Sequence, residues 1–369
     1  MKPRARDLNI RFGQLQPGPL NAITDVPGVR VGHSEVRGRS AKGRDILTGV
    51  TVIEPRLVSS SQHPCFAGVH VLNGNGDATG LEWIREAGLL TSPLAFTNTH
   101  SLGVVRDALI AIDREQQPDD GRLYWNMPVV LETFDGLLND INGFHVQPEH
   151  VAEAVRNASS GPVTEGSVGG GSGMICHEFK GGIGTASRRL NSPQGGWTVG
   201  AIVQANHGVR NELRVDGYPV GRYMTQVDSP FLKAALPHPG MGSIVVCLAT
   251  DAPLLPHQCT RLAQRASLGL ARTGGGNEDH SGDIFIAFAT GNQVPPAAYQ
   301  TKRSPTCDNL SMVNNDHISE LFLAATEAVE EAIINALLAA DSAEGNGHAV
   351  PGLDAETLLE ALREAGWRA

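Results

Sequence analysis

The sequence predicts an α+β fold in which stacked β-sheets are covered by helices. Segments of strand character alternate with segments of helical periodicity along the 369 residues. Several strand segments are apolar throughout, which is typical of strands buried on both faces. The sequence shows no repeat of fixed period, so nothing in it indicates an array of repeated units.

Short segments rich in Val, Ile, Phe and Thr, and bounded by Gly, Pro or Asn, are the predicted strands. They are Gly28–His33, Gly49–Glu54, Phe66–Leu72, Leu94–Thr99, Met127–Glu132, Trp197–Ala205, Glu212–Val215, Ser243–Thr250 and Asp283–Thr290. Two of them, SIVVCLAT at Ser243–Thr250 and DIFIAFAT at Asp283–Thr290, are continuous apolar runs. We expect both to lie in the interior of a sheet.

Apolar residues that recur with a period near 3.6 give the predicted helices. They are Leu81–Leu90, Val104–Arg114, Pro148–Ala158, Pro256–Arg272, Asp316–Ala340 and Asp354–Glu364. Pro148 and Pro256 stand in the first turn, where a missing N–H leaves no helical hydrogen bond unmade. Helices therefore follow strands along most of the chain.

Three segments are predicted to be irregular. Gly166–Gly184 is rich in glycine and indicates tight turns, while Tyr223–Met241 reads as an exposed, proline-containing linker. Asp341–Gly352 is polar and predicts a linker before the last helix. We expect one domain over residues 1–369, with 341–369 forming this linker and a C-terminal helix.

Composition excludes several classes of function. The formal net charge is −10, and no run of Lys or Arg occurs beyond Lys2–Arg6, so we expect no nucleic-acid partner and no anionic membrane surface. No segment reaches the length of about 18–20 apolar residues that spans a bilayer. Met1–Gly13 lacks the apolar centre of a signal peptide. The sequence thus predicts a cytoplasmic protein.

Cofactor and metal signatures are absent from the sequence pattern. The five cysteines show no CxxC spacing and are expected to be reduced and mostly buried, and the thirteen histidines show no HExxH motif. The glycine-rich segment has Ser172 where a P-loop needs Lys, and it has no GxGxxG spacing. We therefore expect no metal and no cofactor. The segment is interpreted as a set of turns or as one wall of an active site.

The dipeptide Gly242–Ser243 precedes a buried strand and has two interpretations. It can be an ordinary turn. It can also be a site of self-cleavage, in which the Ser243 hydroxyl attacks the Gly242 carbonyl and leaves Ser243 with a free α-amine. Such an amine has a pKa of roughly 7.7–8.0. It could accept the proton of its own hydroxyl, which gives a nucleophile that needs neither histidine nor metal.

Three further positions carry groups that could assist such a nucleophile. Ser281 and Asp283 would point to one side of a strand and could share a hydrogen bond, or they could form a plain turn. Asn206 offers an amide that could stabilise an oxyanion, although Asn before Gly is common in turns. Glu132 could bind a cationic amine or be a solvated carboxylate at a strand end.

Seven ordered blocks make the sequence resemble the L-aminopeptidase/D-esterase (DmpA-type) family, which includes the β-peptidyl aminopeptidases. They are NAITDVPGVRVGH (Asn21–His33), NGNGDATGLEWI (Asn73–Ile84), TNTHSLGVVRDA (Thr97–Ala108), ETFDGLLNDING (Glu132–Gly143), FKGGIGTASR (Phe179–Arg188), GSIVVCLATDAPLLPHQ (Gly242–Gln258) and SGDIFIAF (Ser281–Phe288). The general resemblance continues to about Ala340.

The resemblance implies a four-layer αββα sandwich like that of N-terminal-nucleophile hydrolases, of the DmpA and ornithine acetyltransferase type. It also implies cleavage into residues 1–242 and 243–369, which stay together and assemble into a homo-oligomer, a tetramer. Ser243 falls on the family's nucleophile and Gly242 on its scissile partner. The supporting hydroxyl–carboxylate pair is implied at Ser281 and Asp283.

The remaining positions of the resemblance concern the substrate. Asn206 falls on the oxyanion-hole Asn, and Glu132 falls on the carboxylate that binds the substrate's free amine. Phe134 stands where some relatives have a hydroxylated aromatic, and Asp77 stands where Glu is more familiar. Both differences concern the choice of substrate.

The predicted function is therefore a serine aminopeptidase or amidohydrolase that forms an acyl-enzyme on Ser243. Its partner would be a small peptide, amide or ester with a free amine. Two alternatives remain at this point: a transacylase of the ornithine acetyltransferase type, whose members have a Thr nucleophile, and an unprocessed scaffold without activity. The sequence leaves open whether the substrate is an L-amino acid amide, a D-alanyl ester, a β-peptide or a nylon-like amide.

Overall fold

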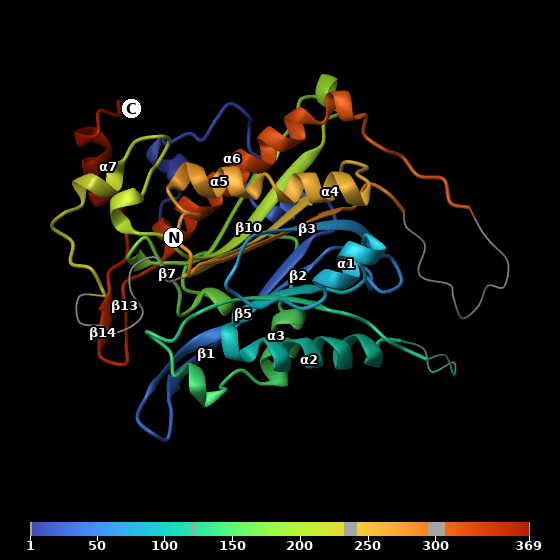
Figure 1. Cartoon of the computed structure of the whole chain (residues 1–369), viewed down its shortest axis with the longest axis horizontal. Coiled ribbons are helices and arrows are strands. Elements are labelled where there is room, and N and C mark those ends of the chain that lie inside the picture. The colour runs from blue at the N-terminus through green and yellow to red at the C-terminus, as the bar shows by residue number, and fades with distance from the viewer. Residues whose placement is uncertain are drawn as a thin grey trace.

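Two β-sheets stack face to face, and helices cover the outer face of each, so the chain forms a four-layer αββα sandwich (Figure 1). The computed structural model describes residues 2–117, 119, 121, 123–231, 242–293 and 307–368. The two ends of the chain lie on the same side of the molecule, at the left of Figure 1. The α+β class and the four layers expected from the sequence are confirmed.

The larger sheet has six strands in the order β4-β3-β12-β11-β10-β9. These strands are β3 (Cys65–Gly74), β4 (Leu89–Leu90), β9 (Gly182–Arg189), β10 (Thr198–Asn206), β11 (Ser243–Thr250) and β12 (Gly282–Ala289). The two central strands, β11 and β12, pair in parallel, and their neighbours pair with them antiparallel. Both central strands are buried along their whole length, as their apolar sequences predict.

The smaller sheet has four strands in the order β1-β2-β5-β6. They are β1 (Arg30–Arg39), β2 (Asp45–Glu54), β5 (Leu94–Asn98) and β6 (Val129–Thr133). Two short hairpins stand apart from both sheets: β7 (Ile175–Cys176) with β8 (Phe179–Lys180), and β13 (Ala343–Gly345) with β14 (His348–Val350).

The outer layers are helical. The helices are α1 (Leu81–Ala87), α2 (Leu102–Glu115), α3 (Pro148–Arg156), α4 (Pro256–Ala263), α5 (Ala266–Thr273), α6 (Ser319–Ala339) and α7 (Ala355–Glu364). Single 3₁₀ turns occur at Ala5–Leu8, Ile23–Asp25, Thr99–Ser101, Ile141–Gly143, Gly169–Gly171, Ser192–Gln194, Arg210–Glu212, Val220–Tyr223 and Asn315–His317. Helices α4, α5 and α6 cover the six-stranded sheet, and α2 and α3 cover the four-stranded sheet (Figure 1).

Three apolar cores separate the four layers. The core between the sheets includes Phe96 of the smaller sheet and Val245 and Ile286 of the larger sheet, all fully buried. A second core lies under α4–α6, and a third lies under α2 and α3. Because successive strand residues alternate between faces, β11 and β12 contribute to the cores on both of their sides.

A buried ion network fastens α6 to the sheet beneath it. Arg188 of β9 is fully buried, and its guanidinium lies 3.0 Å from a carboxylate oxygen of Glu327 and 2.8 Å from one of Glu331. Arg6 reaches the other oxygen of Glu331 at 2.9 Å. Two ionised carboxylates can be buried in this helix because buried and partly buried guanidinium groups pair with them.

Local structure departs from the sequence predictions at several element ends. The predicted helix Pro256–Arg272 is divided into α4 and α5, because the turn between them tightens through the bonds from Arg265 N to Leu262 O and from Leu268 N to Arg265 O. Helix α1 ends at Ala87 because Gly88 adopts a φ of 69°, and β4 follows it.

Two predicted connections also differ. The segment expected as the linker Asp341–Gly352 contains the hairpin β13–β14, and Glu212–Val215, expected as a strand, contributes only an isolated bridge between Val215 and Tyr218. Of the expected linker Tyr223–Met241, residues 232–241 lie outside the described residues.

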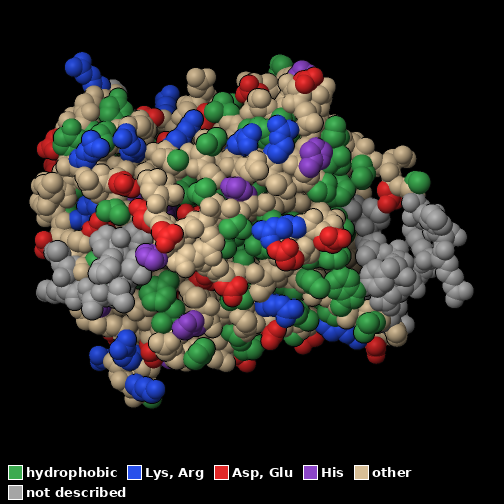
Figure 2. Space-filling view, viewed as in Figure 1, with side chains coloured by type: hydrophobic (Ala, Val, Ile, Leu, Met, Phe, Trp, Pro, Cys, Tyr) green, Lys and Arg blue, Asp and Glu red, His purple; other side chains and the backbone are tan. Residues whose placement is uncertain are grey.

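On the face shown in Figure 2, basic side chains are interspersed with acidic ones and form no single-sign field. Within the described ranges, the helices include none that is long and apolar enough to cross a membrane.

We predict that Arg188→Leu lowers the free energy of unfolding by about 3–5 kcal/mol, because buried Glu327 loses its cation and Glu331 keeps only Arg6. Urea unfolding followed by circular dichroism measures the change. Arg85→Ala, which removes an exposed ion pair with Glu82, is the control and is expected to change stability by less than about 1 kcal/mol. Equal effects of the two substitutions would contradict the anchoring role of the network.

Candidate active site

Ser243 is the first residue of β11, at the end of the central strands of the larger sheet. In the strand register it lies opposite Asn206 of β10 on one side and Gly282 of β12 on the other. Its side chain is buried, and its Oγ accepts a hydrogen bond of 3.0 Å from the backbone N–H of Gly282. The sheet therefore holds this hydroxyl in a defined position.

Gly242 passes directly over the end of β10. A Cβ placed on Gly242 would lie 1.8 Å from the carbonyl oxygen of Asn206, which is far inside van der Waals contact. Only glycine fits there without displacing the backbone of Asn206. The Gly242 carbonyl is consequently unshielded by a side chain of its own, as expected of a peptide bond that a neighbouring hydroxyl attacks.

Ser281 and Asp283 form the hydroxyl–carboxylate pair that strand alternation predicts. The Ser281 hydroxyl donates to Asp283 Oδ1 at 2.6 Å, and both side chains are buried. Burial raises the pKa of Asp283 to about 6, and the Ser281 hydrogen bond opposes this rise because it favours the charged carboxylate. Gly282, which separates the two residues, is the donor to Ser243 Oγ, so the pair adjoins the hydroxyl of Ser243.

The Asn206 side chain is held by two backbone groups. Its Oδ1 accepts from Ile175 N at 2.7 Å, and its Nδ2 donates to Phe134 O at 2.9 Å. The backbone N–H of Ile175 can only donate, which defines the orientation of the amide. The amide carries a second N–H, which is the group that could serve an oxyanion.

Glu132 comes from β6, in the other sheet. Its Oε1 accepts from Asp77 N at 2.8 Å, and its Oε2 accepts from the Thr99 hydroxyl. Burial raises the pKa of this carboxyl, while the two hydrogen bonds oppose the rise. A Cβ on Gly76 would lie 3.2 Å from Glu132 Oε1 and 3.3 Å from Gly282 Cα. Gly76 thus lies close to both the Glu132 carboxylate and Gly282, the residue at the start of β12 that contacts Ser243.

Phe134 and Asp77, the two positions at which the sequence differs from some relatives, have exposed side chains. The Asp77 carboxylate accepts from Ala78 N, and only the backbone N–H of Asp77 contacts Glu132. Sequence reasoning missed Thr99 and the backbone groups of Ile175 and Phe134. A hydroxyl directly after the strand Leu94–Asn98 was a usable signal for Thr99, whereas the backbone contacts have no signature in side-chain type.

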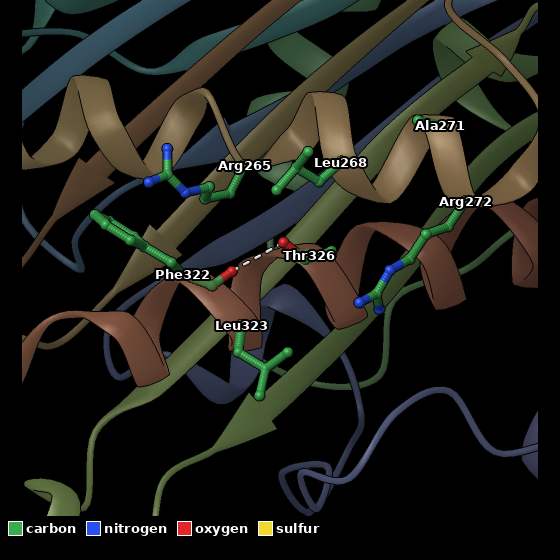
Figure 3. A pocket seen from close by; sticks show the side chains of 7 residues that line it. All are labelled: Arg265, Leu268, Ala271, Arg272, Phe322, Leu323 and Thr326. Carbon is green, nitrogen blue, oxygen red and sulfur yellow. Dashed lines mark hydrogen bonds between the residues drawn. The ribbon is translucent and has the colours of Figure 1, made fainter.

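A separate hollow of about 510 Å³ lies on the helical layer, between α5 and α6. Figure 3 shows Arg265 above the Phe322 ring, with 4.0 Å between the guanidinium carbon and the ring centroid. The hollow is lined by Arg265, Leu268, Ala271, Arg272, Phe322, Leu323 and Thr326. None of the candidate active-site residues lies among them.

Comparisons with known proteins identify the family of this chain. The sequence model of Peptidase family S58 matches residues 21–350. The beta-peptidyl aminopeptidase BapA of Sphingosinicella microcystinivorans is 44% identical, over 98% of this chain and 92% of that protein. BapA of Sphingosinicella xenopeptidilytica is 38% identical, over 98% of this chain and 91% of that protein.

Solved structures show the same fold over complete chains. A beta-aminopeptidase of Burkholderia sp. has 65% identity and a TM-score of 0.94, with each chain covered completely. The L-aminopeptidase D-Ala-esterase/amidase of Ochrobactrum anthropi, described as a variant of the Ntn hydrolase fold, has 44% identity and a TM-score of 0.90, again over both whole chains.

The αββα sandwich is the Ntn hydrolase fold, as in the Ochrobactrum anthropi enzyme. The chain belongs to Peptidase family S58. It is an aminopeptidase, and its substrates are peptides or amides. The family expected from the seven sequence blocks is confirmed.

We predict that Ser281→Ala moves the acidic limb of the kcat/KM profile to higher pH. This prediction applies if the Ser281–Asp283 pair takes the proton of Ser243, in which case the limb reports the ionisation of Asp283. Burial raises the pKa of Asp283 to about 6, and the hydrogen bond that is lost had favoured the ionised form. We also expect kcat/KM above the limb to fall by about 10²-fold or more. The control is Ser267→Ala, a buried hydroxyl on α5. A limb that stays in place or moves to lower pH would exclude this role of the pair.

Proposed function

We propose that the chain is a self-processing serine aminopeptidase whose nucleophile is Ser243. The observation that carries the proposal is the position of Ser243: it heads β11, follows a glycine that no other residue can replace, and accepts a hydrogen bond from Gly282 beside the Ser281–Asp283 pair. These contacts supply a fixed hydroxyl, an open carbonyl before it and a hydroxyl–carboxylate pair on the two residues that flank Gly282.

Self-processing would begin when Ser243 Oγ attacks the carbonyl carbon of Gly242. The bond from that carbon to Ser243 N breaks, the nitrogen takes up the hydroxyl proton, and an ester joins Gly242 to Ser243 Oγ. Water then hydrolyses the ester, which leaves a carboxylate on Gly242 and a free α-amine on Ser243. The products are residues 1–242 and residues 243–369, which remain together because β10, β11 and β12 belong to one sheet.

Substrate cleavage would repeat the same chemistry on an external amide. The hydroxyl of Ser243 attacks the first carbonyl of the substrate and passes its proton to its own amine or into the Ser281–Asp283 pair. The bond from that carbonyl carbon to the leaving nitrogen then breaks, the nitrogen takes up this proton, and an ester joins the acyl group to Ser243 Oγ. The second N–H of Asn206 and neighbouring backbone N–H groups hold the oxyanion. Water then releases the acyl group and restores the hydroxyl.

Glu132 is the proposed binding group for the substrate's free amine. Its carboxylate is buried, keeps both oxygens hydrogen-bonded and lies close to the strand end that contacts Ser243. A β-aminoacyl group at the N-terminus is the favoured substrate, because a beta-aminopeptidase is 65% identical and two beta-peptidyl aminopeptidases align over 98% of the chain. Transacylation and a scaffold role are not favoured by these relatives.

The assembled enzyme is proposed to be a cytoplasmic homo-oligomer of processed two-chain units, a tetramer by its resemblance to the family. The free cysteines support a reducing compartment, since four of the five are buried thiols and none of those described is in a disulfide.

We predict that the purified protein consists of two species, residues 1–242 and 243–369, and that Ser243→Ala yields one unbroken chain. Removing the hydroxyl removes the nucleophile for the N→O acyl shift. Intact-mass spectrometry reads both results, and Ser267→Ala serves as a control that should cleave normally. Cleavage at another bond, or a wild-type chain that stays whole, would remove Ser243 from this role while leaving the fold and the family unaffected.

We predict that Glu132→Gln reduces kcat/KM for a β-aminoacyl p-nitroanilide by about 10- to 100-fold, because a hydrogen bond to a charged group contributes about 1.5–3 kcal/mol. The loss should be much smaller for the N-acetylated substrate, which has no charged amine. Glu82→Gln, an exposed carboxylate on α1, is the matched control. Equal losses on both substrates would show that Glu132 maintains structure rather than binds the amine.

A further inference from the structure

A buried cluster of one thiol and two imidazoles lies next to the candidate active site and takes no part in the proposed mechanism. One ligand atom from each of Cys176, His177 and His207 lies within 4.8 Å of the other two, and all three residues are buried. Cys176 Sγ is 3.8 Å from His207 Nδ1, and the two imidazole rings meet edge to face with 5.1 Å between their centroids.

The hydrogen bonding of the cluster is incomplete. His177 Nδ1 lies 3.0 Å from the carbonyl oxygen of Val209, so this nitrogen carries the proton and Nε2 carries the lone pair. Within the described part of the chain, the Nε2 atoms of His177 and His207 have no hydrogen-bond partner. An unsatisfied buried polar group costs about 1–3 kcal/mol, so the free lone pair on His177 Nε2 indicates a missing occupant on the side of Cys176 and His207.

The backbone adopts an uncommon conformation at the residues that follow Cys176. The hairpin β7–β8 turns through His177 and Glu178, whose φ values are 47° and 63°. These are the conformations of a type I′ turn, which Asn and Gly normally occupy. The pairing of His177 N with His207 O, at 2.7 Å, ties the turn to the end of β10. The hairpin β7–β8 and the end of β10 therefore bring the three proposed ligand residues together.

We propose that Cys176, His177 and His207 form a binding site for one Zn²⁺ ion. One thiolate and two imidazoles are the donor types that zinc prefers, and a tetrahedral zinc holds sulfur and nitrogen ligands about 3.5 Å apart. The observed separation of 3.8 Å between Cys176 Sγ and His207 Nδ1 is close to that value.

The surroundings of the cluster are compatible with a cation. Glu178 and Glu212 lie near His177 and favour positive charge there. The neighbouring ammonium of Lys180 does not pair with the thiol, since its Nζ donates to the carbonyl oxygens of Gly171, Met174 and Gly181.

A bound ion would stabilise the part of the site that holds Asn206. Cys176 directly follows Ile175, whose N–H donates to Asn206 Oδ1, and His207 directly follows Asn206. A metal that joins Cys176 to His207 would therefore fix both segments that orient this amide. The binding itself does not depend on the role proposed for Ser243.

The test is the metal content of the complete chain, purified from zinc-supplemented cells and desalted. We expect about one zinc per chain in the wild type and in Cys247→Ala, a buried cysteine outside the cluster, and less than about a tenth of that in Cys176→Ala. Circular dichroism checks that the variants fold. A wild type without zinc, or a Cys176→Ala variant that retains it, would overturn the proposal and leave an ordered water as the occupant.

A second measurement needs no variant. Wild-type protein produced with cobalt in place of zinc is expected to show the intense d–d absorption of a tetrahedral site together with a thiolate-to-cobalt charge-transfer band. Cobalt binding with weak, octahedral absorption and no thiolate band would place the metal elsewhere and contradict the Cys176 site. Because neither readout uses substrate, failure here is distinguishable from failure of the proposed peptidase mechanism.

Discussion

The candidate active site depends on the parallel pairing of β11 with β12 at the centre of the six-stranded sheet. That pairing sets Ser243 beside Gly282, so that the N–H of one strand end holds the hydroxyl of the other. It also places the Ser281–Asp283 pair at the same edge. Parallel strands start at the same edge of a sheet, and for this reason residues about forty positions apart in sequence become neighbours.

The second sheet completes the site across the interior of the sandwich. Glu132 reaches the region from β6, while the backbone of Phe134, just past that strand, fixes Asn206 of β10. Stacked sheets pack about 10 Å apart, a distance that side chains from both inner faces can bridge. In the proposed mechanism the four-stranded sheet binds the substrate and the six-stranded sheet carries the covalent chemistry. The relative position of the two sheets depends on the apolar core between them.

Buried charge in this protein is consistently paired or hydrogen-bonded. Arg188 compensates Glu327 and Glu331 under α6, and Glu132 is satisfied by a backbone N–H and a hydroxyl. Asp283 and Asp135 are only partly satisfied: Oδ1 of each accepts a side-chain hydrogen bond, from Ser281 and Asn139 respectively, while Oδ2 of each has no partner among the described residues. Burial raises the pKa of both carboxyl groups to about 6, and their hydrogen bonds oppose this rise.

The sequence by itself determined the apolar strands, the major helices, the layered α+β class and the family, because periodicity and contiguous motifs are local properties. Strand order, the hairpin β13–β14 and the division of α4 from α5 were decided by tertiary packing. So were the partners of Asn206, which are backbone groups without a side-chain signature. The Cys176–His177–His207 cluster also appeared only in three dimensions, since its ligands meet through pairing of segments about thirty residues apart.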